Sequence, residues 1–279
     1  MENKVIDVLN MTAWRMEAPQ LFGGFHVTAS LLSAALAILA AVIFARHAKN
    51  KTQVCRILAA TGWILIILEV YKQFFLYYVM NGGAFDFWFF PFQLCSVPMY
   101  LCIILPLFTT DTRLTMMTFM GGYTFVSAAA ALIFPEDILR PYITLTVHGF
   151  VWHGLLLFIS LFIFLTGYTD ASIRGLRRAA VLFGILCVIA LGINIAAESV
   201  MPAIRTAHPL IEHDWAAMFY LNPFHISPQP VVSTVQRRLG IPAGLLLYIL
   251  AVAAVSSVVI RLFRSVFQEN ISNVLDNNL

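Results

Sequence analysis

Seven segments of the sequence stay apolar over about 20 residues, the length that an α-helix needs to cross the hydrocarbon core of a bilayer. Backbone groups cannot stay unpaired in lipid, so such segments restrict the chain to a bundle of helices. We expect the spans at residues 26–45, 57–78, 87–108, 114–134, 143–165, 179–199 and 241–263. The sequence therefore predicts an all-α integral membrane protein with a bundle of seven transmembrane helices.

The composition supports this prediction. Of the 279 residues, 60% are hydrophobic and 11% are charged, whereas about 25% of the residues in a soluble domain are charged. The net charge is +3, and the chain lacks the long basic run that binds nucleic acid. The cysteines have neither the spacing of a disulfide framework nor that of a zinc site: Cys55, Cys95, Cys102 and Cys187. We therefore expect no nucleic acid, cofactor or metal.

The chain is expected to form one membrane domain with a short segment at each end. Residues 1–25 mix charged and apolar residues, which is typical of an interfacial segment and not of a cleaved signal peptide. The membrane domain covers residues 26–265, and a cytoplasmic tail covers residues 266–279. Residues 200–240 contain several prolines and aromatic residues and are too long for a turn, so we expect them to cap the bundle.

The distribution of lysine and arginine predicts the orientation of the bundle. Ten of these residues lie in the connections after the first, third and fifth spans and at the C-terminal end of the last span, where Arg261 and Arg264 lie, whereas six lie on the other side. Cytoplasmic loops are the ones enriched in positive residues. We therefore expect the N-terminus outside, the C-terminus in the cytoplasm and the long loop on the extracytoplasmic side.

The third expected span carries polar groups inside an apolar run. Residues 88–95 read WFFPFQLC, which places Pro91, Gln93 and Cys95 within this span. With a rise of about 1.5 Å per residue, Cys95 is expected roughly 12 Å below the outer end of its helix, and His153 roughly 15 Å below the outer end of the fifth span. The thiol and the imidazole are therefore expected at a similar depth.

Further polar residues are expected in the same outer half of the bundle. Glu69 and Lys72 are spaced i, i+3 on the second span and can pair. Asn194 lies in the outer half of the sixth span, and His26 and His148 open the first and fifth spans. Because polar side chains are costly in hydrocarbon, this convergence predicts one outward-facing cavity.

Cys95 and His153 together favour nucleophilic catalysis. A thiol becomes nucleophilic when a base takes its proton, and an imidazole can do so and then protonate the leaving group. Gln93 lies about 200° from Cys95 on a regular helix. Pro91 and Pro98 can distort that helix, and the Gln93 amide could then serve as an oxyanion donor.

The same residues also have structural interpretations, and other functions stay open. Cysteines and polar residues in spans often only pack or bond to neighbouring helices, and Glu69 and Lys72 can form a structural ion pair. A metal site would use histidines spaced i, i+5, which lie about 140° apart on a helix and chelate poorly: His148 with His153, and His208 with His213 beside Asp214. A transporter would suit the broken third span, although no second half mirrors the first.

Two motifs resemble a known family. PFQLCSVPMY in the third span and HGFVWHGLLLF in the fifth resemble the YwaF-like integral membrane proteins, which are similar to the transmembrane protein 164 family. The FGGFHV stretch, with His26, resembles the opening segment of that family, and Asn194 is similar to a polar position in its sixth span. The positions that match the two family motifs are Pro91, Leu94, Cys95, His153, Gly154 and Leu155.

The resemblance implies a seven-span bundle that acts as a cysteine acyltransferase. In that interpretation Cys95 takes an acyl group from a phospholipid, with His153 as base, and passes it to a lysophospholipid. Gln93 departs from the family pattern, in which a histidine is common. We therefore expect an enzyme of the bacterial plasma membrane that transfers or hydrolyses lipid acyl groups through a Cys/His dyad. The alternatives are a membrane binding or sensor protein, a small-molecule transporter and, less favoured, a metal-dependent membrane hydrolase.

Overall fold

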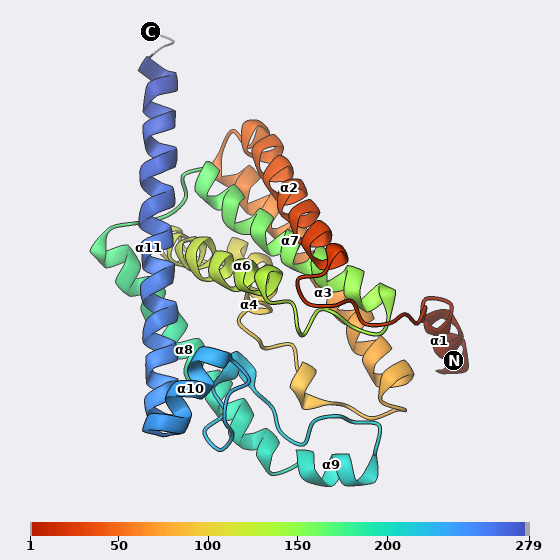
Figure 1. The fold of residues 1–279 in the computed structure, drawn as a ribbon. Coiled ribbons are helices and arrows are strands. Elements are labelled where there is room, and N and C mark those ends of the chain that lie inside the picture. The colour runs from red at the N-terminus through yellow and green to blue at the C-terminus, as the bar shows by residue number, and fades with distance from the viewer. Residues whose placement is uncertain (1, 277–279) are drawn as a thin grey trace.

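The structure is a computed structural model that describes residues 2–276, and its regular elements are helices (Figure 1). The α-helices are α1 (Glu2–Asn10), α2 (Gly24–His47), α3 (Lys51–Phe75), α4 (Val97–Ile104), α5 (Thr110–Phe119), α6 (Phe125–Ile133), α7 (Ile143–Leu165), α8 (Ile173–Glu198), α9 (Met201–Ala207), α10 (Pro230–Leu239) and α11 (Ile241–Asp276). The short 3₁₀ and π elements are η1 (Leu76–Met80), η2 (Phe87–Phe89), η3 (Leu105–Leu107), η4 (Met120–Thr124) and η5 (Met218–Tyr220).

Six helical stretches of the described chain are long and apolar enough to cross a membrane. They are Gly24–His47, Lys51–Met80, Thr110–Ile133, Ile143–Leu165, Ile173–Glu198 and Ile241–Phe267. Large apolar side chains cover their outward faces; Leu31 of α2, for example, is 66% exposed. Exposed apolar surface of this extent is what a lipid-facing helix presents. The prediction of an all-α membrane protein is thus confirmed, whereas that of seven full-length spans is not.

The third expected span, residues 87–108, was wrongly predicted as a transmembrane helix of full length. The Asp86 side chain accepts a hydrogen bond from the Trp88 N–H and caps only the short η2. Pro91 has no N–H for a helical hydrogen bond, and the chain is irregular until α4 begins at Val97, with Pro98 in its first turn. The apolar helix Val97–Leu107 is therefore shorter than the six spans.

This break changes the expected placement of Cys95. The Ser96 N–H donates to the Gln93 carbonyl oxygen at 2.8 Å, so Cys95 lies in a turn before α4 and not within a helix. A depth calculated from the helical rise does not apply to this turn, nor does the angle of 200° between Gln93 and Cys95. The position of Cys95 has to be taken from its contacts.

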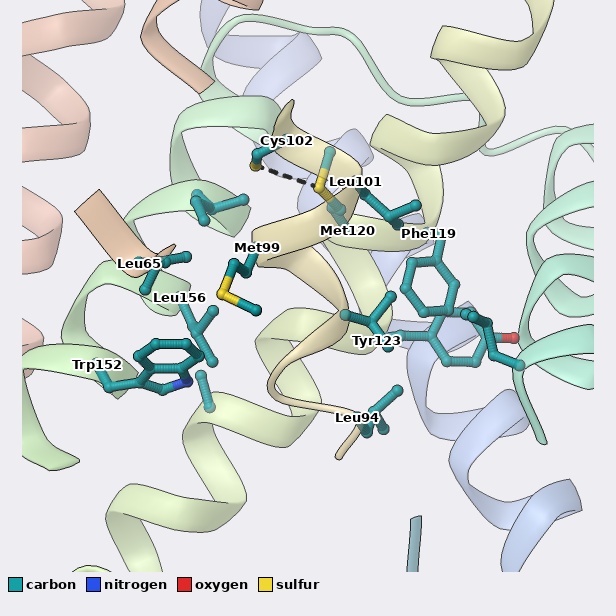
Figure 2. Close-up of a cluster of buried hydrophobic side chains, with 14 of the residues drawn as sticks. Leu65, Leu94, Met99, Leu101, Cys102, Phe119, Met120, Tyr123, Trp152 and Leu156 are labelled. Carbon is teal, nitrogen blue, oxygen red and sulfur yellow. Dashed lines mark hydrogen bonds between the residues drawn. The ribbon is translucent and has the colours of Figure 1, made fainter. Parts of the chain in front are cut away.

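The core of the bundle forms where α3, α4 and α7 meet the middle of the α5–α6 span. Figure 2 shows Leu65 of α3, Met99 of α4 and Leu156 of α7 in one cluster of buried apolar side chains. The Cys102 thiol donates to the Met120 sulfur at 3.6 Å in the same cluster. Cys102 is fully buried and lies among apolar side chains of the core.

Residues 200–240 fold back onto one end of the bundle, the end that also holds the connection between α3 and α4 (Figure 1). Met218 and Phe219 of η5 are fully buried against the core. His213 pairs with Asp86 at 2.9 Å, which ties this segment to the α3–α4 connection. We call residues 200–240 the cap.

Candidate functional site

A cavity of about 330 Å³ lies between the cap and the bundle. Small-molecule sites are commonly clefts of this size or larger, with mostly apolar walls and few polar groups. The polar or ionisable residues that line it are Lys72, Gln93, Cys95, Ser96, Ser127, Asp137, Arg140, His148, Trp152, His153, Tyr220, Gln229 and Tyr248. Five of the eight residues that the sequence pointed to are among them: Lys72, Gln93, Cys95, His148 and His153.

The turn that carries Cys95 is hydrogen-bonded to Trp152 of α7, the residue before His153. The indole N–H of Trp152 donates to the Cys95 carbonyl oxygen at 3.2 Å. Within the described residues no hydrogen bond joins the Cys95 thiol to the His153 ring. The structure therefore brings the two side chains to one cavity without a direct bond between them.

The hydrogen bonds of the two cavity histidines define their tautomers. His153 Nδ1 lies 2.8 Å from the Gly149 carbonyl oxygen, which can only accept, so Nδ1 carries the proton and Nε2 keeps its lone pair. His148 has the opposite tautomer, because its Nε2 lies 3.0 Å from the Leu68 carbonyl oxygen. His153 thus has the form in which Nε2 can accept a proton.

The expected pair on the second span is present. Lys72 Nζ lies 2.9 Å from Glu69 Oε1, and Gln73 donates to the same oxygen at 2.7 Å. The Lys72 ammonium also lies over the Trp152 ring, 5.9 Å from its centroid. Glu69 itself is buried behind Lys72, and the described lining of the cavity does not include it. The pair therefore presents a partly neutralised ammonium to the cavity.

Gln93 and Asn194 are occupied in holding the cap. The Gln93 amide donates to the Ala217 carbonyl oxygen at 3.1 Å and accepts from the Phe219 N–H at 2.9 Å. Asn194 donates to the Met218 carbonyl oxygen at 3.0 Å and accepts from the Met218 N–H at 2.6 Å. Both side chains therefore bind backbone groups at the start of η5.

His26 lies away from the described lining of the cavity. Its Nδ1 accepts from the Phe22 N–H at 2.9 Å, and its Nε2 lies 2.9 Å from the Leu132 carbonyl oxygen. Both ring nitrogens are used to connect the start of α2 to the end of α6. The contacts of His26 are structural.

Several cavity residues were not selected from the sequence. Tyr220 of the cap donates through its hydroxyl to Asp137 Oδ2 at 3.3 Å, and Arg140 lies over the Phe89 ring at 4.7 Å. Burial raises the pKa of Tyr220 well above its usual value, and the Asp137 carboxylate adds to this effect. The only sequence signal was the aromatic content of the cap, which does not indicate which ring faces the cavity.

Asp214 and His213, two of the residues considered for a metal site, have other partners. Asp214 pairs with Arg205 at 2.9 Å, and His213 pairs with Asp86 and stacks on the Trp88 ring at 4.3 Å. In the part of the chain that the structure describes, no group of three or more His, Cys, Asp and Glu side chains is arranged to hold a metal ion.

The six apolar helices and their exposed apolar faces define an integral, multi-pass membrane protein. The profile of the TMEM164 family matches residues 21–260, and the chain belongs to this family. No curated protein and no solved structure gave a match. The family match covers the six spans up to the middle of α11 and every residue named above as lining the cavity.

Proposed function

We propose that the protein is a membrane enzyme that transfers or hydrolyses lipid acyl groups, with Cys95 as nucleophile and His153 as general base. One observation carries this proposal: Cys95 and His153 line the same mostly apolar cavity, and His153 has its lone pair on Nε2. A thiol and a neutral imidazole in one site are the components of cysteine-dependent acyl transfer.

In the first step the Cys95 thiol passes its proton to His153 Nε2 while Sγ bonds to the carbonyl carbon of a lipid ester. The ester C–O bond then breaks, and the departing oxygen takes the proton from His153. In the second step the hydroxyl of a lysophospholipid, or water, gives its proton to His153 and attacks the thioester carbon. The C–S bond breaks, the proton returns to sulfur, and a new ester or a free acid leaves.

The shape of the cavity supports a lipid as substrate. Val126, Ala130 and Phe134 of the α6 region line it, and Val252 lines it from α11. Phe134 is also 62% exposed, so this wall continues into the lipid-facing surface. An acyl chain can therefore approach sideways from the bilayer. Lys72 and Arg140 offer cationic groups to an anionic head group.

The charge distribution of the chain indicates on which side of the membrane the reaction takes place. The positive residues favour an outward-facing cavity, with the N-terminus outside and the C-terminus in the cytoplasm of a bacterial plasma membrane. In this setting phospholipids of the outer leaflet supply the acyl group. Gln93 is not assigned as an oxyanion donor, because its amide is held by the cap at both atoms: Nε2 donates to the Ala217 carbonyl oxygen and Oε1 accepts from the Phe219 N–H.

The test is to trap the acyl-enzyme. Protein in lipid nanodiscs that contain a phospholipid with a fluorescent acyl chain should acquire a fluorescent adduct, and hydroxylamine should release it because thioesters are labile to this reagent. The adduct should be lost in Cys95→Ser. It should persist in Cys187→Ala, which removes a buried thiol outside the described lining of the cavity.

Absence of an adduct, together with an unchanged lipid profile in Cys95→Ser, would overturn the proposal. A transporter would instead give substrate flux in liposomes that survives Cys95→Ser. A metal-dependent hydrolase would give lipid turnover that requires a stoichiometric metal, and both the metal and the turnover would be lost in His153→Ala.

A further inference from the structure

Two consecutive residues of η5 have an unusual backbone conformation. Phe219 has a φ of 54° and Tyr220 a φ of 58°, and neither is a glycine. A side chain in this left-handed region clashes with its own backbone, so bulky residues rarely adopt it. Such a conformation persists only where the surrounding structure imposes it, and such positions cluster at functional sites.

The side chains of Gln93 and Asn194 impose this conformation. Gln93 bonds to the Ala217 carbonyl oxygen and the Phe219 N–H, while Asn194 bonds to both backbone groups of Met218. Four hydrogen bonds thus fix three successive residues from two different parts of the bundle. Phe219 is also fully buried and stacks on the Phe92 ring at 5.8 Å.

Tyr220 directly follows these three residues, and its side chain has contacts of its own. Tyr220 lines the cavity together with Cys95 and His153, and its ring meets the Tyr248 ring edge to face at 6.4 Å. Its hydroxyl donates to Asp137 Oδ2 at 3.3 Å. Bonds between oxygen atoms are usually about 2.7 Å long, so this bond is weak and can be exchanged for a better acceptor.

We infer that the Tyr220 hydroxyl donates a hydrogen bond to the carbonyl oxygen of the lipid ester while Cys95 attacks the adjacent carbon. The inference rests on the proposed function. As the C–S bond forms, the carbonyl electron pair moves onto oxygen, and the phenol stabilises this charge without giving up its proton. The C=O bond forms again when the leaving oxygen departs with the proton from His153.

The properties of the phenol suit this role. A donor must stay protonated at neutral pH, as a tyrosine hydroxyl ordinarily is, and burial raises the pKa of Tyr220 further above neutrality. An oxyanion donor acts best when it is held in place before the reaction, because no reorganisation is then needed. The bonds from Gln93 and Asn194 provide this preorganisation at the backbone of the cap.

Tyr220→Phe tests the inference because it removes one oxygen and keeps the ring. Two rates are measured on the full-length protein in nanodiscs: acylation of Cys95 by the fluorescent phospholipid, and alkylation of Cys95 by iodoacetamide. Alkylation forms no oxyanion, so it reports only on the thiol and its access. We expect acylation to fall by about 100-fold, the usual effect of losing one oxyanion donor, and alkylation to stay unchanged.

Two matched variants isolate the effect. Tyr248→Phe removes a hydroxyl from another wall of the same cavity, and Asp137→Asn removes the negative charge from the present partner of Tyr220. Acylation should proceed in Tyr248→Phe at close to the rate of the unchanged protein, and it should fall much less in Asp137→Asn than in Tyr220→Phe. Equal losses in Tyr220→Phe and Asp137→Asn would assign the effect to the bond between these residues and would overturn the inference.

The other possible results of the two rate measurements separate the inference from the proposed function. If the unchanged protein acylates Cys95 and Tyr220→Phe does so at the same rate, the inference fails while the proposed function stands. If Tyr220→Phe lowers alkylation as much as acylation, Tyr220 only supports the cavity, and the inference fails. If the unchanged protein forms no acyl-enzyme, the proposed function fails and the inference with it.

Discussion

The indole N–H of Trp152 donates to the carbonyl oxygen of Cys95 at 3.2 Å. Trp152 precedes His153 in α7, and Cys95 lies in the turn before α4, so this bond connects the two elements that carry the proposed dyad. The bond holds the backbone of the turn and does not involve the thiol. The placement of Cys95 relative to α7 therefore depends on a side chain that neither family motif identified as functional.

Trp152→Phe should lower the acylation rate without changing the chemistry of the thiol. The substitution removes the hydrogen bond to the Cys95 carbonyl oxygen, and a typical bond of this kind contributes about 1 kcal/mol. We expect a small decrease in thermal stability in detergent and a larger decrease in acylation, because small displacements of reacting groups slow a reaction strongly. Tyr100→Phe, which removes the bond to the Pro91 carbonyl oxygen, is the control for a general loosening of the same segment.

His153→Asn should abolish most of the acyl transfer. Loss of a general base typically costs about 10²- to 10⁴-fold in rate. The control is His26→Asn, because His26 lies outside the described lining of the cavity but is equally buried. Lipid turnover per folded molecule should fall in the first variant only, and the thermal stability of the protein should fall in the second. Equal turnover in His153→Asn and the unchanged protein would remove His153 from the mechanism.

Asn194→Ala should loosen the cap. The Met218 N–H and carbonyl oxygen are both buried and bonded to Asn194, and each buried polar group left without a partner costs about 1–3 kcal/mol. We expect a clear decrease in thermal stability and faster proteolysis of the cap. Because Gln93 holds the same turn, Asn194→Ala and Gln93→Ala should show non-additive effects when combined. Strictly additive losses would mean that the two amides act independently.

Continuous apolar spans were predictable because a long helix forms all its backbone hydrogen bonds within itself, whatever its neighbours are. The fifth expected span, residues 143–165, coincides with α7 (Ile143–Leu165). The third could not be predicted because Pro91 and Pro98 fit either a kinked helix or a helix start, and only the surrounding contacts decide between them. Lys72 and His153 were found at the cavity because polar residues in apolar spans are conspicuous.

The remaining site residues depend on contacts between distant parts of the chain. Gln93 bonds to residues 217 and 219, more than 120 positions away. No pattern in the sequence around Gln93 indicates that its amide holds the cap. Tyr220, which lines the cavity, follows directly after residues 217–219 in the cap. The sequence therefore identified the polar residues of the spans but not the cap residue that completes the wall of the cavity.

Gly62 offers a test of how closely α3 must approach α4. A Cβ atom at this position would lie 2.8 Å from Cys102 Cβ and 3.2 Å from the Ile103 backbone nitrogen. Real Cβ atoms essentially never come as close as 2.8 Å to another heavy atom, and the backbone of α4 cannot yield as a flexible side chain could. Gly62→Ala should therefore separate the two helices, and overpacking of this kind typically costs about 1–3 kcal/mol.

The control for this prediction is Gly184→Ala on α8, where nothing lies within 4 Å of the added atom. Alanine favours a helix over glycine by about 1 kcal/mol, so this variant should unfold at the same or a higher temperature in detergent. Gly62→Ala should unfold at a lower temperature. Because α4 begins directly after the turn that carries Cys95, Gly62→Ala should also slow acylation at temperatures where the protein is still folded. Unchanged acylation in a destabilised Gly62→Ala protein would show that the Trp152 bond alone sets the position of Cys95.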